Sequence, residues 1–244
     1  MTIKDFIREA LIFSHIDLTK NLKYDRLTKA IMKKHIKNDS NCVDIGCHKG
    51  EILSLMIKFS PKGKHYAFEP IPYLFNEIKE KFEDKAKIYP FALSDTNGKT
   101  TFQLVKNAPA YSGIKQRKYA IKNPEIEEIE VEMKKLDDVI SLKEKIDFIK
   151  IDVEGGEFGV LKGAQKIINK DKPIVLFECG RGASEFYGTK PEDIYDFITK
   201  EIGLKIFTLQ SFIKNNSSMG AKEFENCFNT GEEYYFVAAP HQNS

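Results

Sequence analysis

The segment 41–50, with the sequence NCVDIGCHKG, decides the fold of this 244-residue chain. Its first part, 42–45, is a short apolar run with a single acid and is typical of a buried parallel strand. Gly46 and Gly50 follow, and the apolar spacing over 51–57 then predicts a helix. A strand, a glycine turn and a helix bring backbone N–H groups and a helix N-terminus to the carboxyl edge of a sheet. Doubly wound folds bind their ligands at that edge.

Strand-like and helix-like segments alternate along the rest of the chain. Apolar runs predict further strands at 64–69, 87–93, 146–153, 173–178, 204–209 and 234–239. Helical spacing predicts helices at 73–82, 157–168 and 192–202. This alternation is typical of an α/β domain with a doubly wound, mostly parallel sheet of seven strands. Residues 211–232 are polar and predict a loop, so the last two strands have no helix between them and one of them is expected to be antiparallel.

Two additions to this domain are expected. Residues 1–40 carry helical spacing in two stretches, which predicts an N-terminal helical extension before a main domain at 41–244. Residues 99–105 and 126–133 alternate apolar and polar side chains, which predicts a β-hairpin inserted beside the main sheet. The loop between them, 106–125, is long, and loops of this length are uncommon unless they are functional or mobile. We expect this loop to reach the ligand site.

Composition argues against several classes of protein. The net charge of +2 gives no basic footprint for a nucleic acid partner. No segment approaches the roughly 18 apolar residues of a membrane span. The N-terminus has acids at Asp5 and Glu9 and no small-residue cleavage site, so it is a poor signal peptide and a cytoplasmic location is expected. The four cysteines form no C-x-x-C pair, and no spacing of ligands demands a metal.

Four acids stand at the carboxyl ends of predicted strands: Asp44, Glu69, Asp152 and Glu178. Carboxylates are rarely buried unless they are paired, so four in this position suggest a site. Glu69 ends the second strand, where an acid suits the two hydroxyls of a ribose. The turn reads G-x-x-x-G and lacks the dinucleotide pattern G-x-G-x-x-G. A nucleoside without a pyrophosphate, such as adenosine attached to methionine, therefore fits better than a dinucleotide.

Lys150 lies inside an apolar strand that is expected to be central. Strand alternation puts Lys150 and Asp152 on the same side, and a buried ammonium group needs a partner. Either Asp152 or Glu178 could supply one. Two interpretations of Lys150 stay open. In the first its role is structural, and it either forms a static ion pair or reaches solvent. In the second it belongs to a charged cluster that orients an acceptor hydroxyl or promotes loss of the hydroxyl proton.

Several segments resemble one protein family in the family's own order. They are VDIGCHKG, YAFEPIP, PFALSDTNG, MKKLDDVI, DFIKIDVEGGEFGVLKGA and PIVLFECG, within about residues 41–180. On these motifs the chain resembles the FkbM family of S-adenosylmethionine-dependent methyltransferases. The resemblance implies a class I methyltransferase (Rossmann-like) fold with strand order 3-2-1-4-5-7-6 and strand 7 antiparallel.

The resemblance also implies roles for individual residues. The glycine turn would hold the methionine part of the cofactor, Glu69 the ribose, and residues 92–94 would lie near the adenine. The implied cofactor-binding set is Asp44, Gly46, Cys47, Gly50, Glu69, Ala92, Leu93, Ser94 and Asp152. The resemblance also implies that Asp152 and Glu154 face the transferring methyl and the acceptor. From the chemistry of a hydroxyl acceptor we predict Asp152 as base or orienter, supported by Lys150 and Glu154.

The turn departs from the family at Cys47-His48, where a small residue and an asparagine are usual. We interpret Cys47 as a small residue that lets the backbone approach the ligand, and a reactive thiol is the alternative. We interpret His48 as a solvent-facing loop histidine, with a role as a base as the alternative.

The resemblance implies an S-adenosylmethionine-dependent enzyme, and by analogy with the family we expect it to methylate a hydroxyl of a sugar, a glycan or a small natural product. The [DN]-P-P-[YF] turn of base-amine methyltransferases is absent, and DVEG stands in its place. The candidates to touch the acceptor are Tyr111, Ser112 and Arg181. The alternatives are a different class of acceptor, a nicotinamide oxidoreductase, and a non-catalytic binding protein that kept the fold.

Overall fold

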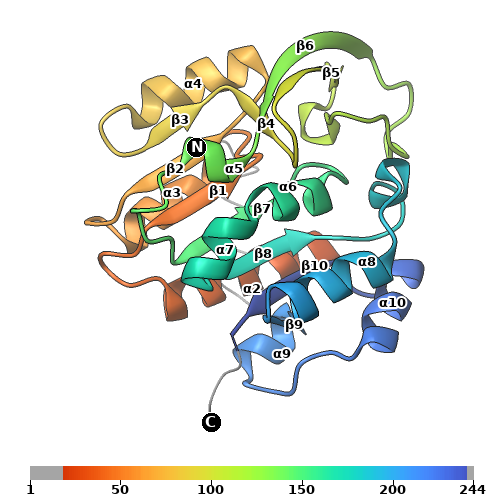
Figure 1. Ribbon diagram of the computed structural model, residues 1–244. Helices are drawn as coiled ribbons and strands as arrows, with labels where there is room; N and C mark the ends of the chain where they lie inside the picture. The colour runs from red at the N-terminus through yellow and green to blue at the C-terminus, as the bar shows by residue number, and fades with distance from the viewer. Residues whose placement is uncertain (1–18, 241–244) are drawn as a thin grey trace.

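A seven-stranded sheet forms the centre of the protein in the computed structural model, which describes residues 19–240 (Figure 1). The strand order is β3-β2-β1-β7-β8-β10-β9, and β10 alone runs antiparallel to its neighbours. This order confirms the predicted class I methyltransferase fold. The strands are β1 (Cys42–Ile45), β2 (His65–Phe68), β3 (Lys87–Tyr89), β7 (Phe148–Ile151), β8 (Ile174–Glu178), β9 (Lys205–Thr208) and β10 (Tyr235–Ala239).

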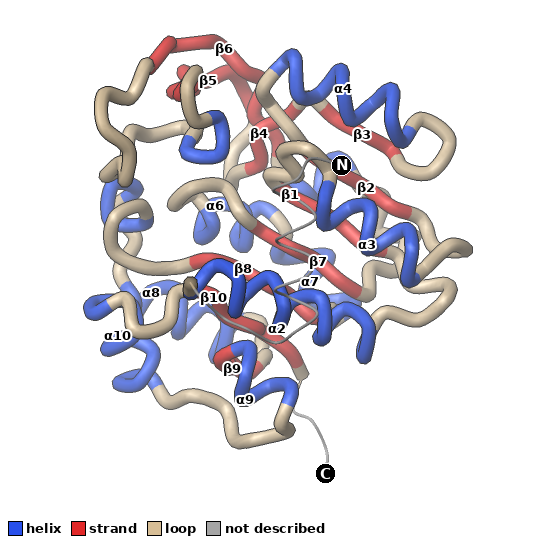
Figure 2. The backbone as a smooth tube through the Cα atoms, turned by 180° about the vertical axis from the view of Figure 1, so that it is seen from behind, coloured by secondary structure: helices blue, strands red, loops and turns tan. Residues whose placement is uncertain are grey.

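Helices cover both faces of this sheet (Figures 1 and 2). One face packs against α5 (Leu136–Val139), α6 (Glu157–Gly163), α7 (Gln165–Asp171), α8 (Pro191–Asp196), the π-helical turn Phe197–Glu201 and α10 (Ala221–Thr230). The other face packs against α2 (Lys20–His35), α3 (Glu51–Phe59), α4 (Pro72–Phe82) and α9 (Leu209–Ile213). None of the helices within residues 19–240 is long and apolar enough to cross a bilayer.

The register of the two central strands brings opposite charges together. β1 and β7 are parallel, with Asp44 opposite Lys150 and Val43 opposite Ile149. Successive side chains of a strand point to opposite faces, so Val43 and Ile149 pack in the core beneath α6 and α7. Asp44 and Lys150 therefore point to the other face, the face that α2 and α3 cover.

A smaller sheet lies beside the main one and contains β4 (Phe91–Leu93), β5 (Gly98–Val105) and β6 (Ile126–Lys134). β5 and β6 pair antiparallel, as predicted for the inserted hairpin. The single strand predicted at 87–93 is wrong in detail, because Pro90 divides it into β3 and β4. Proline has no N–H to donate to a strand ladder. β3 then ends the main sheet at its edge, and β4 pairs with β6 instead.

Two other predicted segments differ from the structure. Residues 211–232 are not a loop throughout, because they include the end of α9 and all of α10. Phe224, Cys227 and Phe228 are buried, and this i, i+3, i+4 spacing is enough for an amphipathic helix although the segment is mostly polar. The helix predicted at 157–168 is divided into α6 and α7 at Ala164.

The described part of the N-terminal extension is α2, which matches the second predicted helical stretch. The first stretch lies outside the described residues. α2 packs into the core of the main sheet and is tied to the segment before β10. Lys23 Nζ lies 2.7 Å from a Glu233 carboxylate oxygen, and the Tyr24 hydroxyl donates to the other oxygen at 2.5 Å.

The glycine turn can be tested by comparing two glycines with the same backbone angle. Gly46 and Gly203 both have φ +74°, but a Cβ at Gly46 would overlap the backbone carbonyl of Asp152, whereas Gly203 faces open space. A left-handed alanine costs roughly 1–2 kcal/mol. We expect Gly203→Ala to lower the free energy of unfolding by about that amount in urea denaturation, and Gly46→Ala to lower it by several kcal/mol more or to prevent folding. Equal losses of unfolding free energy in the two variants would contradict the close approach of Gly46 to the Asp152 carbonyl.

Candidate active site

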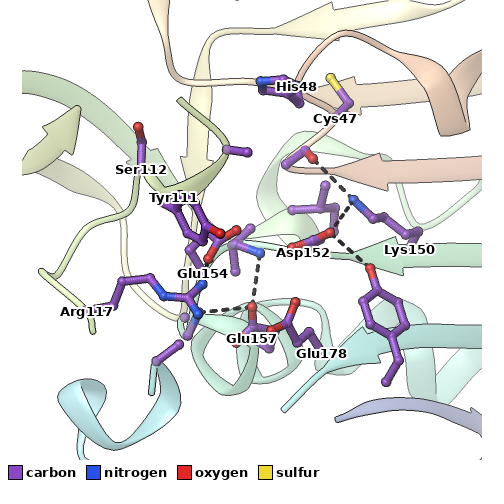
Figure 3. A pocket seen from close by; sticks show the side chains of 18 of the residues that line it. Cys47, His48, Tyr111, Ser112, Arg117, Lys150, Asp152, Glu154, Glu157 and Glu178 are labelled. Carbon is purple, nitrogen blue, oxygen red and sulfur yellow. Dashed lines mark hydrogen bonds and ion pairs between the residues drawn. The ribbon is translucent and has the colours of Figure 1, made fainter. Parts of the chain in front are cut away.

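A cavity of about 830 Å³ lies at the carboxyl ends of β1, β2, β7 and β8 (Figure 3). This volume is in the range of small-molecule sites, and the position is the one expected for a doubly wound sheet. Residues of α2, of the smaller sheet and of the loop 106–125 complete its walls. Six residues of the predicted cofactor set line it: Gly46, Cys47, Glu69, Ala92, Leu93 and Asp152.

The other three residues of that set do not line the cavity. Asp44 is completely buried beneath the turn, next to Lys150. Gly50 precedes α3 in a left-handed conformation and packs against Phe82. Ser94 packs against the glycines of α6.

Lys150 lies at the centre of a buried charged cluster. Its Nζ is 3.2 Å from Asp152 Oδ2 and 3.8 Å from Asp44 Oδ1, and it donates to the carbonyl of Gly46 at 3.3 Å. Glu178, the other partner considered from the sequence, makes no hydrogen bond or ion pair with Lys150 within residues 19–240. Lys150 therefore joins β1, the glycine turn and the end of β7.

Burial and charge act in opposite directions on this cluster. Burial lowers the pKa of Lys150, but the carboxylates of Asp152 and Asp44 outweigh it and raise the pKa above its usual value. Burial raises the pKa of Asp44 to about 6, although the Lys150 ammonium opposes this shift. Lys150 is thus held as a cation that compensates two carboxylates.

Asp152 follows β7 directly and is the most open member of the cluster. Its side chain is 28% exposed, compared with 8% for Lys150. The hydroxyl of Tyr235, from β10, donates to Asp152 Oδ2 at 3.0 Å. The backbone N–H of Asp152 donates to the carbonyl of Ile45 at 3.0 Å. Two strands other than its own therefore hold Asp152 at the cavity wall.

Glu69 ends β2 and is held by two backbone amides. Its oxygens accept from the N–H of His48 at 2.8 Å and the N–H of Ile71 at 3.0 Å. Burial raises the pKa of Glu69 to about 7, and the two amides partly offset the shift. Each oxygen keeps a further acceptor position, so this carboxyl group can bind two neighbouring hydroxyls.

Glu154 connects the cavity with the loop 106–125. It is ion-paired with Arg117, whose guanidinium also lies 5.5 Å from the centre of the Tyr111 ring. Glu154 has φ +58°, a conformation that side chains other than glycine rarely adopt. Strained residues of this kind concentrate at ligand sites. The loop predicted to reach the site does so through this contact.

Two more carboxyl groups complete the acidic wall. Glu157 accepts from the N–H groups of Val153 and Gly155 at 3.0 and 3.1 Å, and burial raises its pKa to about 7. Glu178 lines the cavity, and burial together with the charges of Asp152 and Glu157 raises its pKa. The wall carries more acids than bases, so it favours a cationic ligand.

The turn residues Cys47 and His48 both line the cavity. Cys47 is 5% exposed, and burial raises the pKa of its thiol, which leaves it a small packing residue. The interpretation of His48 as solvent-facing is wrong: its ring is half-buried, and its Nε2 has no hydrogen-bond partner within residues 19–240. Burial lowers the pKa of His48, and the neighbouring charge of Lys49 lowers it further. The backbone N–H of His48 ties the turn to Glu69.

All three candidate acceptor contacts line the cavity. Ser112 also has an internal role, because its Oγ accepts from the N–H of Val105 at 2.9 Å. Tyr111 lies beside the Arg117 guanidinium, and Arg181 is exposed at the rim.

Sequence reasoning missed Tyr235, Arg117 and Glu157. The signal for Glu157 was present in DVEGGE, since an acid directly after two glycines begins a helix at the sheet edge. Tyr235 and Arg117 had no local signal, because only the packing of β10 and the path of the loop bring them to β7. Within residues 19–240, no three histidine, cysteine or acidic side chains are grouped so that they could hold a metal ion.

The sheet order and the cavity at its carboxyl edge define a class I methyltransferase fold. Residues 44–205 match the family described as the methyltransferase FkbM domain, which is well over half of the chain. The chain therefore belongs to the FkbM methyltransferase domain family. No curated protein sequence matches it.

A solved structure that matches this chain shares its fold. Methyltransferase FkbM from Methylobacillus flagellatus KT matches with a TM-score of 0.51 and 14% identity, over 83% of this chain and 44% of the other. This chain thus spans less than half the length of that protein. A putative rRNA methylase from Clostridium thermocellum matches with a TM-score of 0.48 and 8% identity, over 88% of this chain and 95% of the other. The first match shows a shared fold, and the second is too distant to carry an argument.

The buried carboxyl of Glu157 predicts a pH dependence of stability. Between its ordinary pKa of 4.5 and the folded value of about 7, only the folded state holds this proton, so stability falls as pH rises through that window. Glu157→Gln keeps an oxygen acceptor for both amides and has no such proton. We expect the free energy of unfolding of this variant, relative to that of wild type, to rise by on the order of 3 kcal/mol between pH 4.5 and pH 7. This figure follows from about 1.4 kcal/mol for each pKa unit.

The measurement is urea denaturation across that pH range. The control is Glu80→Gln, at an exposed position on α4, whose stability difference from wild type should stay flat. Parallel pH curves for Glu157→Gln and wild type would contradict the assignment.

Proposed function

We propose that this protein is an S-adenosylmethionine-dependent methyltransferase that methylates a hydroxyl of a sugar, a glycan or a small natural product. One observation carries the proposal: a single cavity in an FkbM domain joins the glycine turn, the ribose-type acid Glu69 and the strand-end acid Asp152. The cytoplasmic location, and a small-molecule or glycan acceptor instead of nucleic acid or a membrane, stay predictions from the sequence.

The residues present fit the proposed cofactor. Glu69 has acceptor positions for the two ribose hydroxyls, and the apolar side chains of Ile71, Phe91 and Leu93 offer a surface for a flat base. The turn at Gly46 and Cys47 would lie against the methionine part. The excess of carboxyl groups near Asp152 suits a ligand whose sulfonium is cationic.

The proposed chemistry needs positioning and one proton acceptor. When bound, S-adenosylmethionine supplies a methyl group that is already electrophilic. Asp152 accepts the proton of the acceptor hydroxyl as its oxygen bonds to the methyl carbon. Lys150 pairs with Asp152 and holds its carboxylate in place, and the in-line arrangement of acceptor and methyl supplies much of the rate. Glu154, tied to Arg117, would contact the acceptor from the loop side.

The first test uses ligand binding. We expect S-adenosylhomocysteine to bind in isothermal calorimetry and to raise the melting temperature, because it keeps the adenosine and methionine parts. NAD should do neither, since the turn lacks the pyrophosphate pattern. Binding of NAD instead would favour the oxidoreductase alternative. The protein could also bind S-adenosylhomocysteine and yet transfer no methyl group to any of a panel of hydroxyl and amine acceptors. That result would favour the alternative of a non-catalytic binding protein.

The second test concerns the ribose contact. Glu69→Gln removes the charge and turns one acceptor oxygen into a donor, so one hydroxyl contact is lost. We expect the dissociation constant of S-adenosylhomocysteine to rise about 10- to 100-fold, since a hydrogen bond to a charged group is worth roughly 1.5–3 kcal/mol. Glu80→Gln is again the control and should bind as wild type. An unchanged affinity in Glu69→Gln would remove Glu69 from the cofactor site.

A further inference from the structure

The two oxygens of the Asp152 carboxylate have different surroundings. Oδ2 is approached by Lys150 Nζ at 3.2 Å and accepts from the Tyr235 hydroxyl at 3.0 Å. Oδ1 has no hydrogen bond from any residue within 19–240. Figure 3 shows the contact between Lys150 and Asp152. Both donors thus occupy one oxygen and leave the other free.

We propose that Tyr235 is a positioning residue that fixes the Asp152 carboxylate with Oδ1 as the proton-accepting atom. This inference rests on the proposed function, in which Asp152 serves as the base. It adds to that function a residue from the antiparallel strand β10 and the identity of the reacting oxygen.

Asp152 needs such a constraint because of its place in the chain. β7 ends at Ile151, so Asp152 lies just beyond the paired strand. The terminal torsion of an aspartate is broad, and a single donor leaves the carboxylate free to turn about that contact. Two donors from different strands, one a point charge and one a directed hydroxyl, hold the plane of the carboxylate.

Tyr235 is itself held firmly enough to act in this way. It pairs in register with Glu178 of β8, and its ring lies 5.6 Å from the ring of Tyr24 on α2. A tyrosine has two side-chain torsions, and here the sheet and a helix restrict both. Its hydroxyl is therefore a rigid donor.

The arrangement also suits the proton transfer. Both donors lie on Oδ2, so Oδ1 keeps its lone pairs for the incoming proton. In the transfer the acceptor oxygen bonds to the methyl carbon and its proton moves to Oδ1. The carbon–sulfur bond breaks, and its electron pair stays on sulfur.

Two cofactor analogues provide a test that needs no known acceptor. Sinefungin carries an ammonium group near the position of the transferred methyl, and S-adenosylhomocysteine carries nothing there. The ratio of their dissociation constants therefore reports how well Asp152 faces that position. The ratio is measured by calorimetry at one fixed pH for wild type, Tyr235→Phe, Asp152→Asn and the double variant.

We expect Tyr235→Phe to reduce the preference for sinefungin about five- to tenfold, the effect of one hydrogen bond to a charged group. In the Asp152→Asn background, Tyr235→Phe should add nothing. Tyr195→Phe is the matched control, since its hydroxyl donates to Met219 on the opposite face and its ratio should equal that of wild type.

The outcomes separate the possible failures. The proposal is overturned if Tyr235→Phe has the same ratio of dissociation constants as wild type. It is also overturned if Tyr235→Phe changes this ratio equally in the wild-type and the Asp152→Asn backgrounds. Either result would leave Tyr235 a packing residue. Failure of wild type to bind S-adenosylhomocysteine would instead reject the proposed function. A crystal structure of wild type with sinefungin decides the case even if Tyr235→Phe does not fold. The ammonium nitrogen should lie against Oδ1, and its position against Oδ2 would overturn the proposal.

Discussion

The buried ammonium group of Lys150 is the constraint on which the rest of the site depends. A charge in the centre of a sheet is costly unless it is paired, and Lys150 is paired with Asp44 on β1 and Asp152 after β7. The register that sets Asp44 opposite Lys150 is therefore the one that satisfies this charge. A slip of one residue would turn Lys150 into the apolar core beneath α6 and α7.

This pairing shapes the electrostatics of the whole cavity. Because Lys150 pairs with two carboxylates and Arg117 with Glu154, the acids Glu69, Glu157 and Glu178 form no ion pair with a basic side chain within residues 19–240. Burial then raises the pKa values of Glu69 and Glu157 to about 7 and also raises the pKa of Glu178. A cationic ligand relieves this excess of acids, which is the physical basis for preferring a sulfonium cofactor.

Much of the fold could be predicted because its signals are local. The apolar runs of β1, β7 and β8 and the glycine turn predicted the parallel core, the family resemblance implied its strand order, and alternation predicted the β5–β6 hairpin. The failures have equally local causes. Pro90 lies inside the single strand predicted at 87–93 but divides two strands in different sheets, and the short apolar stripe of α10 is surrounded by polar residues.

The sequence by itself determined that acids end the strands, that a glycine turn follows β1, and that Lys150 and Asp152 share one side of β7. These properties follow from strand periodicity and from the backbone freedom of glycine. Only the tertiary structure decided that Asp44 is the second partner of Lys150, that Arg117 pairs with Glu154, and that Tyr235 binds Asp152. Each of these contacts joins segments that no periodicity relates, because strand register, loop path and side-chain rotamers are set by packing across the whole domain.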